Sequence, residues 1–282
     1  MYLNDFGMKG LELKETLDLR YEPIAINFAN NLTDVPKEAI RPYRDQNVHY
    51  AMCQAITLVK TKGLILALTL EDQWCWKPPI AAGMVKVEEG TNAWDIAIKN
   101  CGVLDPQLAA ANFRELPKLP YGSCQAIVIA PLSKINYKPD VILVYCHKAT
   151  QINWFIGGAK LKSGKRLPTE LDYMDSCIWS TIPTLQEGKM RFTLPDPGEL
   201  DRAACPEDEM IISIPAKMFV EVADGAMHKL KKQKERLKNV DGTPKMKSSM
   251  EPDFPRPEFY TELYKIWGLE SGGKIIWTEK ER

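Results

Sequence analysis

The stretches CQAIVIAPL, residues 124–132, and DVILVYC, residues 140–146, decide the fold of this chain. Each is a short, continuous run of apolar, largely β-branched residues, which is typical of a strand in the core of a sheet. A third run of this kind, EMIISIP, spans residues 209–215. The sequence therefore predicts that these three strands form the core of a sheet with helices packed on it.

Helical and extended patterns alternate on both sides of these strands. Apolar residues at helical spacing predict helices at residues 11–18, 49–63, 92–100, 106–115, 149–162, 174–187 and 216–230. Short apolar runs predict further strands at residues 21–28, 64–70 and 191–194. Because strands and helices interleave without a regular βαβ rhythm, we expect an α+β fold with a mixed sheet rather than a doubly wound fold.

The chain of 282 residues is long enough for one large domain or two of ordinary size. We expect a single α+β domain at residues 1–228. Residues 229–282 are first strongly basic and then rich in proline, which predicts a C-terminal extension. Within it, EFYTELYKIWGL, residues 258–269, predicts a short helix that docks on its own domain or on a second subunit as a homodimer.

The composition narrows the choice of partners and compartment. Lysine plus arginine and aspartate plus glutamate are equal at 37 each, so the net charge does not favour a nucleic-acid or anionic-membrane partner. No stretch approaches the roughly 18 apolar residues of a membrane span, and the N-terminal sequence has no apolar signal region. We therefore expect a cytoplasmic protein with reduced thiols that acts on a small molecule.

Two segments, residues 53–75 and 177–205, share an order of features. Each begins with a cysteine, runs through a predicted helix to a glycine, continues into a strand that ends in Thr-Leu and reaches a second cysteine. The similarity is either a coincidence between two helix-turn-strand units or the sign of two pseudo-symmetric halves, residues 1–122 and 123–228. In the second case, four thiols would meet at one site: Cys53, Cys75, Cys177 and Cys205.

A series of motifs runs in order from the first predicted strand to the last. They are LRYEPIAINF (19–28), CQAITLVKTKG (53–63), IVIAPL (127–132), PDVILVY (139–145), QINWFIGGAKLKSG (151–164), DSCIWSTIPTLQEGKMRFTLPDPG (175–198) and DEMIISIPAKMF (208–219). Together with the Cys75 turn and the AAGM that follows it, these motifs resemble domain-of-unknown-function family 169, the archaeal cysteine-rich proteins also found in anaerobic bacteria. The resemblance covers roughly residues 11–226.

The resemblance implies that three of the cysteines recur in the family. These are Cys53, Cys75 and Cys177, whereas Cys205 is an addition in this chain. The family usually follows its second cysteine with Pro-Gly-Gly, but here Trp76-Lys77-Pro78-Pro79 stands instead, so the local loop differs. Members are largely uncharacterised, so the resemblance supports the fold and the thiol trio rather than a reaction.

The stretch TLEDQWCWKPP, residues 69–79, places Cys75 between two tryptophans and among charged residues, whereas a packed cysteine usually lies in an apolar run. Thiolates are the normal ligands of iron-sulfur clusters. We therefore expect Cys53, Cys75 and Cys177 to hold a 4Fe–4S cluster with one iron free of protein thiolate. Such an iron can polarise a hydroxyl or carboxyl group or supply electrons. With Cys205 as a fourth ligand, the cluster would instead suit electron transfer or a structural role.

Groups suited to acid-base chemistry and substrate binding lie near these cysteines in the sequence. The candidates for acid-base catalysis are Asp72, Asp175 and His49. The candidates for binding a substrate are Arg44 and Lys77, which would hold a carboxylate, and Trp74 and Trp76, which would wall a pocket. Each of these residues also has a structural interpretation, as a turn former, a solvated charge or an anchor in the core.

Three hypotheses for function stay open at this point. The first is an enzyme of anaerobic metabolism, a lyase or reductase whose cluster acts on a small organic acid or oxygenated ring compound. The second is a non-catalytic module that binds zinc or a small ligand. The third is a metal-free enzyme with Cys75 as nucleophile, which no histidine nearby in the sequence supports. Cysteines expected to be structural are Cys101, Cys124 and Cys146.

Overall fold

The computed structural model describes residues 4–167, 169–236 and 258–268. The chain divides into two compact units, Met1–Lys231 and Lys232–Arg282. In the second unit, α12 (Glu258–Ile266) is the short helix expected in the C-terminal extension. The proline-rich stretch within 237–257 and residues 269–282 lie outside the described residues. None of the helices in the described ranges has the length and apolar character needed to cross a membrane.

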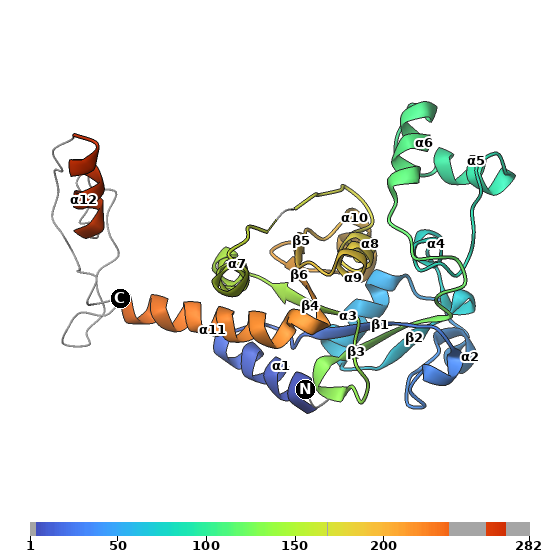
Figure 1. The fold of residues 1–282 in the computed structure, drawn as a ribbon. Coiled ribbons are helices and arrows are strands. Elements are labelled where there is room, and N and C mark those ends of the chain that lie inside the picture. Colours follow the sequence, from blue (N-terminus) through green and yellow to red (C-terminus); the bar gives the residue numbers. More distant parts are fainter. Residues whose placement is uncertain (1–3, 168, 237–257, 269–282) are drawn as a thin grey trace. The chain divides into compact units, whose positions relative to one another are not determined.

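A six-stranded sheet in the order β2-β3-β1-β4-β6-β5 forms the centre of the first unit (Figure 1). Its strands are β1 (Ile24–Ala29), β2 (Leu66–Leu68), β3 (Ala126–Pro131), β4 (Val141–Cys146), β5 (Arg191–Thr193) and β6 (Met210–Pro215). The α+β class is confirmed. All pairings between neighbouring strands are antiparallel, so the sheet is not the mixed one expected from the sequence, because apolar runs locate strands without giving their direction.

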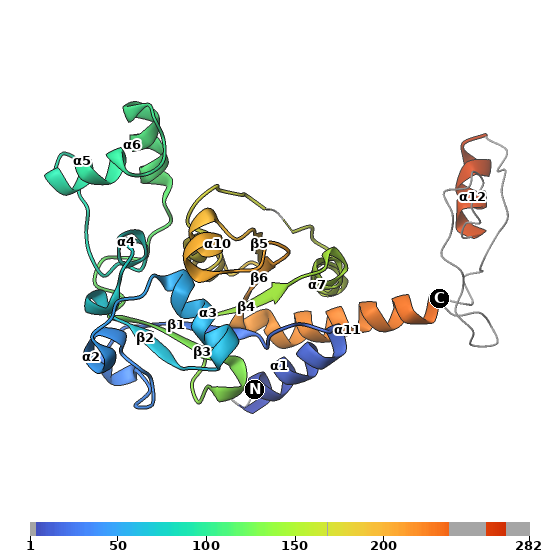
Figure 2. The ribbon, with the colours of Figure 1, turned by 180° about the vertical axis from the view of Figure 1, so that it is seen from behind.

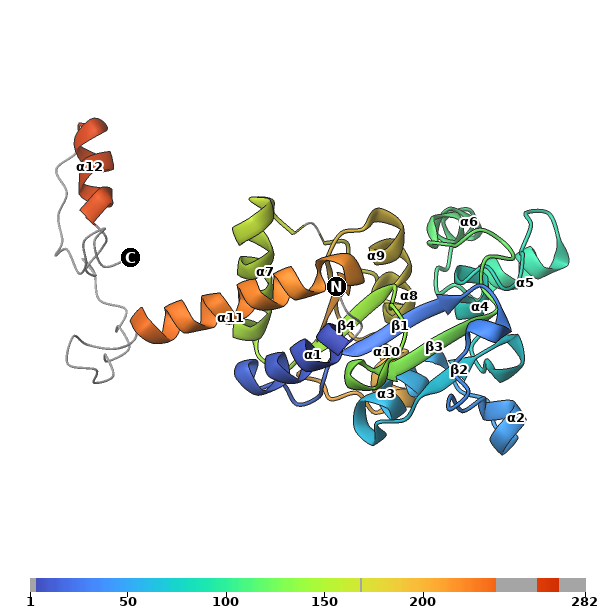
Figure 3. The ribbon, with the colours of Figure 1, turned by 60° about the horizontal axis from the view of Figure 1, so that its bottom comes forward.

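Helices cover both faces of the sheet, which explains why its central strands show no polar alternation. Helices on the first face are α3 (Met52–Lys62), α8 (Ser176–Trp179) and α9 (Ile182–Glu187). Helices on the second face are α1 (Asn4–Leu17), α7 (Ala149–Ser163) and α11 (Phe219–Arg236). In β1, Ile24 and Ile26 pack in the first layer and Ala25 in the second. Figure 3 shows α1 beside the beginning of α11, and the rings of Phe6 and Phe219 stack between them.

The sheet has an internal twofold pattern centred on the pairing of β1 with β4. The strand order reads the same from either edge when β1, β2 and β3 are matched with β4, β5 and β6, respectively. The registers also agree, since Ile24 pairs with Pro131 in one half and Val141 with Pro215 in the other. The strand order places the division between β3 and β4, rather than between residues 122 and 123.

The similar cysteine segments fall on equivalent parts of the two halves. In the first, α3 ends at Gly63 with φ 65° before β2, and in the second, α9 ends at Gly188 with φ 62° before β5. Both glycines adopt the left-handed conformation that favours glycine at a helix end. The sequence similarity therefore coincides with a structural repeat.

Several helices differ from those expected. The helix expected at residues 49–63 begins at Met52, and the one at 174–187 is two helices, α8 and α9. Three short helices were not predicted: α2 (Pro42–Gln46), α4 (Lys77–Ala81) and α10 (Pro197–Ala203). Each has proline in its first turn, where the missing N–H costs nothing, and not in its interior. Figure 2 shows α5 (Asn92–Lys99) and α6 (Pro106–Glu115) standing as a pair beyond α4.

A close backbone contact joins α7 to α11 on the second face of the sheet. A Cβ atom added to Gly158 would lie 2.4 Å from the backbone nitrogen of Ala226 and 2.7 Å from the carbonyl carbon of Gly225. Gly158 therefore serves helix packing, because only a residue without a Cβ atom lets the two backbones approach this closely.

Replacing Gly158→Ala is expected to lower the free energy of unfolding by about 1–3 kcal/mol, because the new methyl group overlaps fixed backbone. Gly157→Ala is the matched control. Its Cβ would meet only the flexible side chain of Lys229, at 3.1 Å, and alanine is the better helix former. Urea denaturation followed by circular dichroism measures both variants, and equal effects would contradict the packing argument.

Candidate functional site

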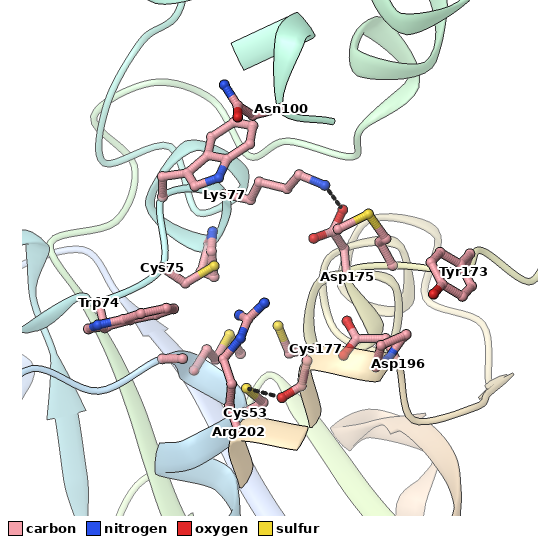
Figure 4. A pocket seen from close by; sticks show the side chains of 17 residues that line it. Cys53, Trp74, Cys75, Lys77, Asn100, Tyr173, Asp175, Cys177, Asp196 and Arg202 are labelled. Atoms are coloured by element: carbon pink, nitrogen blue, oxygen red, sulfur yellow. Dashed lines mark hydrogen bonds and ion pairs between the residues drawn. The ribbon is translucent and has the colours of Figure 1, made fainter. Parts of the chain in front are cut away.

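A cavity of about 440 Å³ lies on the first face of the sheet, among α3, α4, α8 and α10. It is lined by three of the four cysteines proposed to meet: Cys53, Cys75 and Cys177 (Figure 4). Cys53 is the second residue of α3 and Cys177 is the second residue of α8, so the twofold repeat brings them to corresponding positions. Cys75 comes from the turn before α4.

The three thiols share an environment that keeps them protonated in the absence of a cation. All seven cysteines are free, so none of these three is held in a disulfide. Burial raises the pKa of the Cys53 thiol to about 12, and it also raises the pKa of Cys75. The pKa of Cys177 is raised first by burial and then by the negative charges that Cys53, Asp196 and Cys75 would carry. A neutral thiol is a weak nucleophile, so this arrangement does not favour the metal-free mechanism through Cys75.

Four further residues expected at the site also line the cavity: Trp74, Trp76, Lys77 and Asp175. The Nζ of Lys77 lies 2.5 Å from the Oδ2 of Asp175, and both side chains are largely buried. Burial raises the pKa of Asp175, and the charge of Lys77 opposes this shift. Asp175 has φ 66°, an uncommon conformation for a residue other than glycine, and it positions the start of α8. Lys77 is therefore already paired within the protein.

Sequence reasoning missed the contribution of α10 to the cavity. Asp196, at the start of this helix, accepts hydrogen bonds from the backbone nitrogens of Ser176 at 3.0 Å and Glu199 at 2.7 Å, and so joins the beginnings of α8 and α10. Arg202 lies further along the helix, with its guanidinium carbon 5.2 Å from the ring centre of Trp74. The Asp-Pro pair at residues 196–197 is a helix-start signal that could have revealed α10.

Three expected site residues lie outside the cavity lining. Asp72 is fully buried and accepts hydrogen bonds from the Nε of Arg41 and the backbone nitrogen of Tyr43, both at 2.8 Å, so its carboxylate fixes the turn before Cys75. Arg44 pairs with Asp45 at the surface. His49 precedes α3 and stacks on Tyr43, with 4.9 Å between ring centres. These positions give each residue a structural role.

A protein-family model matches residues 12–225, which include the whole sheet and the three cavity cysteines. The chain belongs to the family DUF169, uncharacterised ArCR. Comparison with curated proteins gave no match, and comparison with solved structures gave none either. Membership in DUF169 confirms the family that the motifs resembled, and it carries no described activity.

The fourth cysteine of the repeat lies apart from the cavity lining of this DUF169 member. Cys205 is buried, with its sulfur 3.3 Å from the Oε2 of Glu209 and 3.8 Å from the Nζ of Lys60. Lys60 and Glu209 form an ion pair of 2.5 Å, and both side chains are almost completely buried. Cys101, Cys124 and Cys146 are also buried, and the first two donate to backbone carbonyls. Only three of the seven thiols line the cavity.

A second buried carboxylate connects the cavity wall to the sheet. Glu199 of α10 accepts hydrogen bonds from the hydroxyl of Tyr145 at 2.5 Å and from the hydroxyl of Ser176 at 2.6 Å. These bonds join β4, α8 and α10 and fix the residue before Cys177. Because both acceptor oxygens are satisfied, Glu199 stabilises the wall and needs no ligand.

Lys60→Met is expected to reduce the free energy of unfolding by about 3–5 kcal/mol, because it leaves Glu209 buried without its close partner. Lys9→Met removes the ion pairs that Lys9 forms at the surface with Glu12 and Asp224 and should cost less than about 2 kcal/mol. Adding Glu209→Leu to Lys60→Met should recover part of the loss. Chemical denaturation of the three variants tests this, and a loss in Lys60→Met no larger than that in Lys9→Met would refute the buried pair.

Proposed function

We propose that Cys53, Cys75 and Cys177 hold a 4Fe–4S cluster and that the protein is an enzyme of anaerobic metabolism. It would act on a small oxygenated organic acid or ring compound as a lyase or reductase. One observation carries the proposal: thiols from three separate segments of the chain line a single cavity, and none is in a disulfide. Three free thiols around one space are a donor set suited to an iron-sulfur cluster.

The charged side chains at the cavity leave one cation for a thiolate-bound group. Lys77 is paired with Asp175, and Asp196 accepts hydrogen bonds from backbone nitrogens, so Arg202 is the side chain that can offset part of the charge of three thiolates. In the residues described, no three His, Cys, Asp or Glu side chains stand in an arrangement that would hold a single metal ion. A cluster places its own iron and sulfide atoms between the thiolates, and the cavity of about 440 Å³ leaves space for them.

The residues of the chain have distinct parts in such an enzyme. With three protein ligands, a bound cluster leaves one iron open, which supplies Lewis-acid or electron-transfer chemistry. The Oδ2 of Asp175 and the Nζ of Lys77 are 2.5 Å apart, so the pair can give a proton to a bound substrate or take one from it. Trp74 and Trp76 line the cavity next to Cys75 and offer ring surfaces to a bound substrate.

Protein purified without oxygen is expected to contain about four iron and four sulfide per chain, with a broad absorption band typical of thiolate-bound clusters. Cys53→Ala, Cys75→Ala and Cys177→Ala should each lose most of the iron. Cys205→Ala is the matched control and should retain it, because Cys205 lies beside Lys60 and Glu209.

Metal and acid-labile sulfide analysis of the four variants decides between the candidate functions. Iron-free protein after anaerobic expression and cluster reconstitution would overturn the cluster. If that protein contained zinc that depends on the same three cysteines, the alternative, a zinc or small-ligand binding module, would take its place.

A further inference from the structure

The cavity contains a cation that is not committed to a partner. Arg202 lines it and is exposed, and its guanidinium packs on the ring of Trp74 instead of on a carboxylate. Among the described residues, no aspartate or glutamate forms an ion pair with Arg202. By contrast, Lys77 is buried against Asp175. A substrate anion could bind Lys77 only by competing with that carboxylate, whereas the guanidinium of Arg202 is available.

The contacts of Arg202 fix where an anion would bind. In Figure 4 its guanidinium points into the space between Cys75 and Cys177. The backbone oxygen of Arg202 accepts a hydrogen bond of 3.2 Å from the side chain of Gln54, which ties this part of α10 to α3. The guanidinium also makes a cation–π contact with Trp74, 5.2 Å from the ring centre, and a guanidinium can present two parallel N–H groups to a carboxylate.

Aromatic rings at the cavity are exposed to an unusual degree. Trp74 is 60 % exposed, Tyr173 is 76 % exposed and Trp76 is 38 % exposed, and all three line the cavity. Large rings that stay in water around a concave site provide flat apolar surfaces for a ligand. A flat, unsaturated body stacks on such rings better than a puckered saturated one, because its faces can contact them over the whole ring.

We infer that Arg202 and the rings of Trp74 and Tyr173 form a subsite for a planar carboxylic acid, aromatic or conjugated, with its carboxylate on the guanidinium. This rests on the proposed function and names the class of its substrate. The carboxylate end would lie at Arg202, and the planar body would extend across the cavity beside the thiols. Arg202 takes the role that the sequence suggested for Arg44 or Lys77.

The test is isothermal titration calorimetry with benzoate as the probe, on anaerobically purified protein and on the same protein freed of metal. Benzoate should bind saturably to at least one form. Cyclohexanecarboxylate keeps the charge without the planar ring, and benzyl alcohol keeps the ring without the charge. Both should bind at least tenfold more weakly than benzoate, since each lacks one of the two recognised features.

Variants test whether Arg202 is the residue that binds benzoate. Arg202→Gln should weaken benzoate binding at least tenfold, which corresponds to about 1.4 kcal/mol. Arg202→Lys should give an intermediate affinity, because it keeps the charge and loses the planar fork. Arg44→Gln is the matched control and should bind as the unaltered protein does, since Arg44 lies outside the cavity lining. Far-UV circular dichroism checks that each variant is folded.

The outcomes separate this inference from the cluster proposal. Benzoate binding that depends on Arg202, in protein that takes up no iron after anaerobic expression and cluster reconstitution, would support the subsite and reject the cluster. Iron-containing protein that binds no benzoate either before or after removal of the metal, or binds it equally well in Arg202→Gln, would overturn the subsite and leave the cluster standing. Equal affinity for benzoate and cyclohexanecarboxylate would also overturn it. If Arg202→Gln does not fold, Arg202→Lys and the ligand comparison decide.

Discussion

The pairing of β1 with β4 is the contact on which the rest of the structure depends. Three residue pairs, Ile24–Leu143, Ala25–Ile142 and Ile26–Val141, join two halves of similar topology into one sheet. In this arrangement α3, between β1 and β2, and α8 and α9, between β4 and β5, lie on the same face of the sheet, whereas α7 covers the other face. The beginnings of α3 and α8 therefore meet above the seam, and each carries a cysteine as its second residue.

The two halves of the sheet have similar topology, but the segments that follow β2 and β5 differ, and they contribute different side chains to the cavity. In the first half, the turn after β2 carries Cys75 between two tryptophans and leads directly into α4. In the second half, the corresponding segment is longer and forms α10, which brings Arg202 to the cavity and leaves Cys205 beside Lys60 and Glu209. The longer segment therefore places the guanidinium of Arg202 at the cavity and keeps the thiol of Cys205 out of the cavity lining. In the proposed enzyme, this difference would leave room for a substrate beside three thiols.

Sequence patterns predicted the parts of the structure that depend on local order. The central strands β3 and β4 were found because both of their sides are buried, and the helix ends at Gly63 and Gly188 because a left-handed residue was needed there. The site was predicted in part: Asp72 was chosen because it lies in the turn before Cys75, and Arg44 as a cation for a carboxylate, yet their partners hold them elsewhere. Arg202 was missed because only the packing of α10 on α3 brings it to the thiols.

We propose that three thiols from separate segments bind one iron-sulfur cluster. X-ray diffraction from crystals of protein kept free of oxygen, recorded on both sides of the iron absorption edge, would locate the iron. An anomalous peak is expected in the cavity, bonded to the sulfur atoms of Cys53, Cys75 and Cys177. A cavity without iron, or iron bonded to Cys205 beside Glu209, would refute the cluster at these three cysteines.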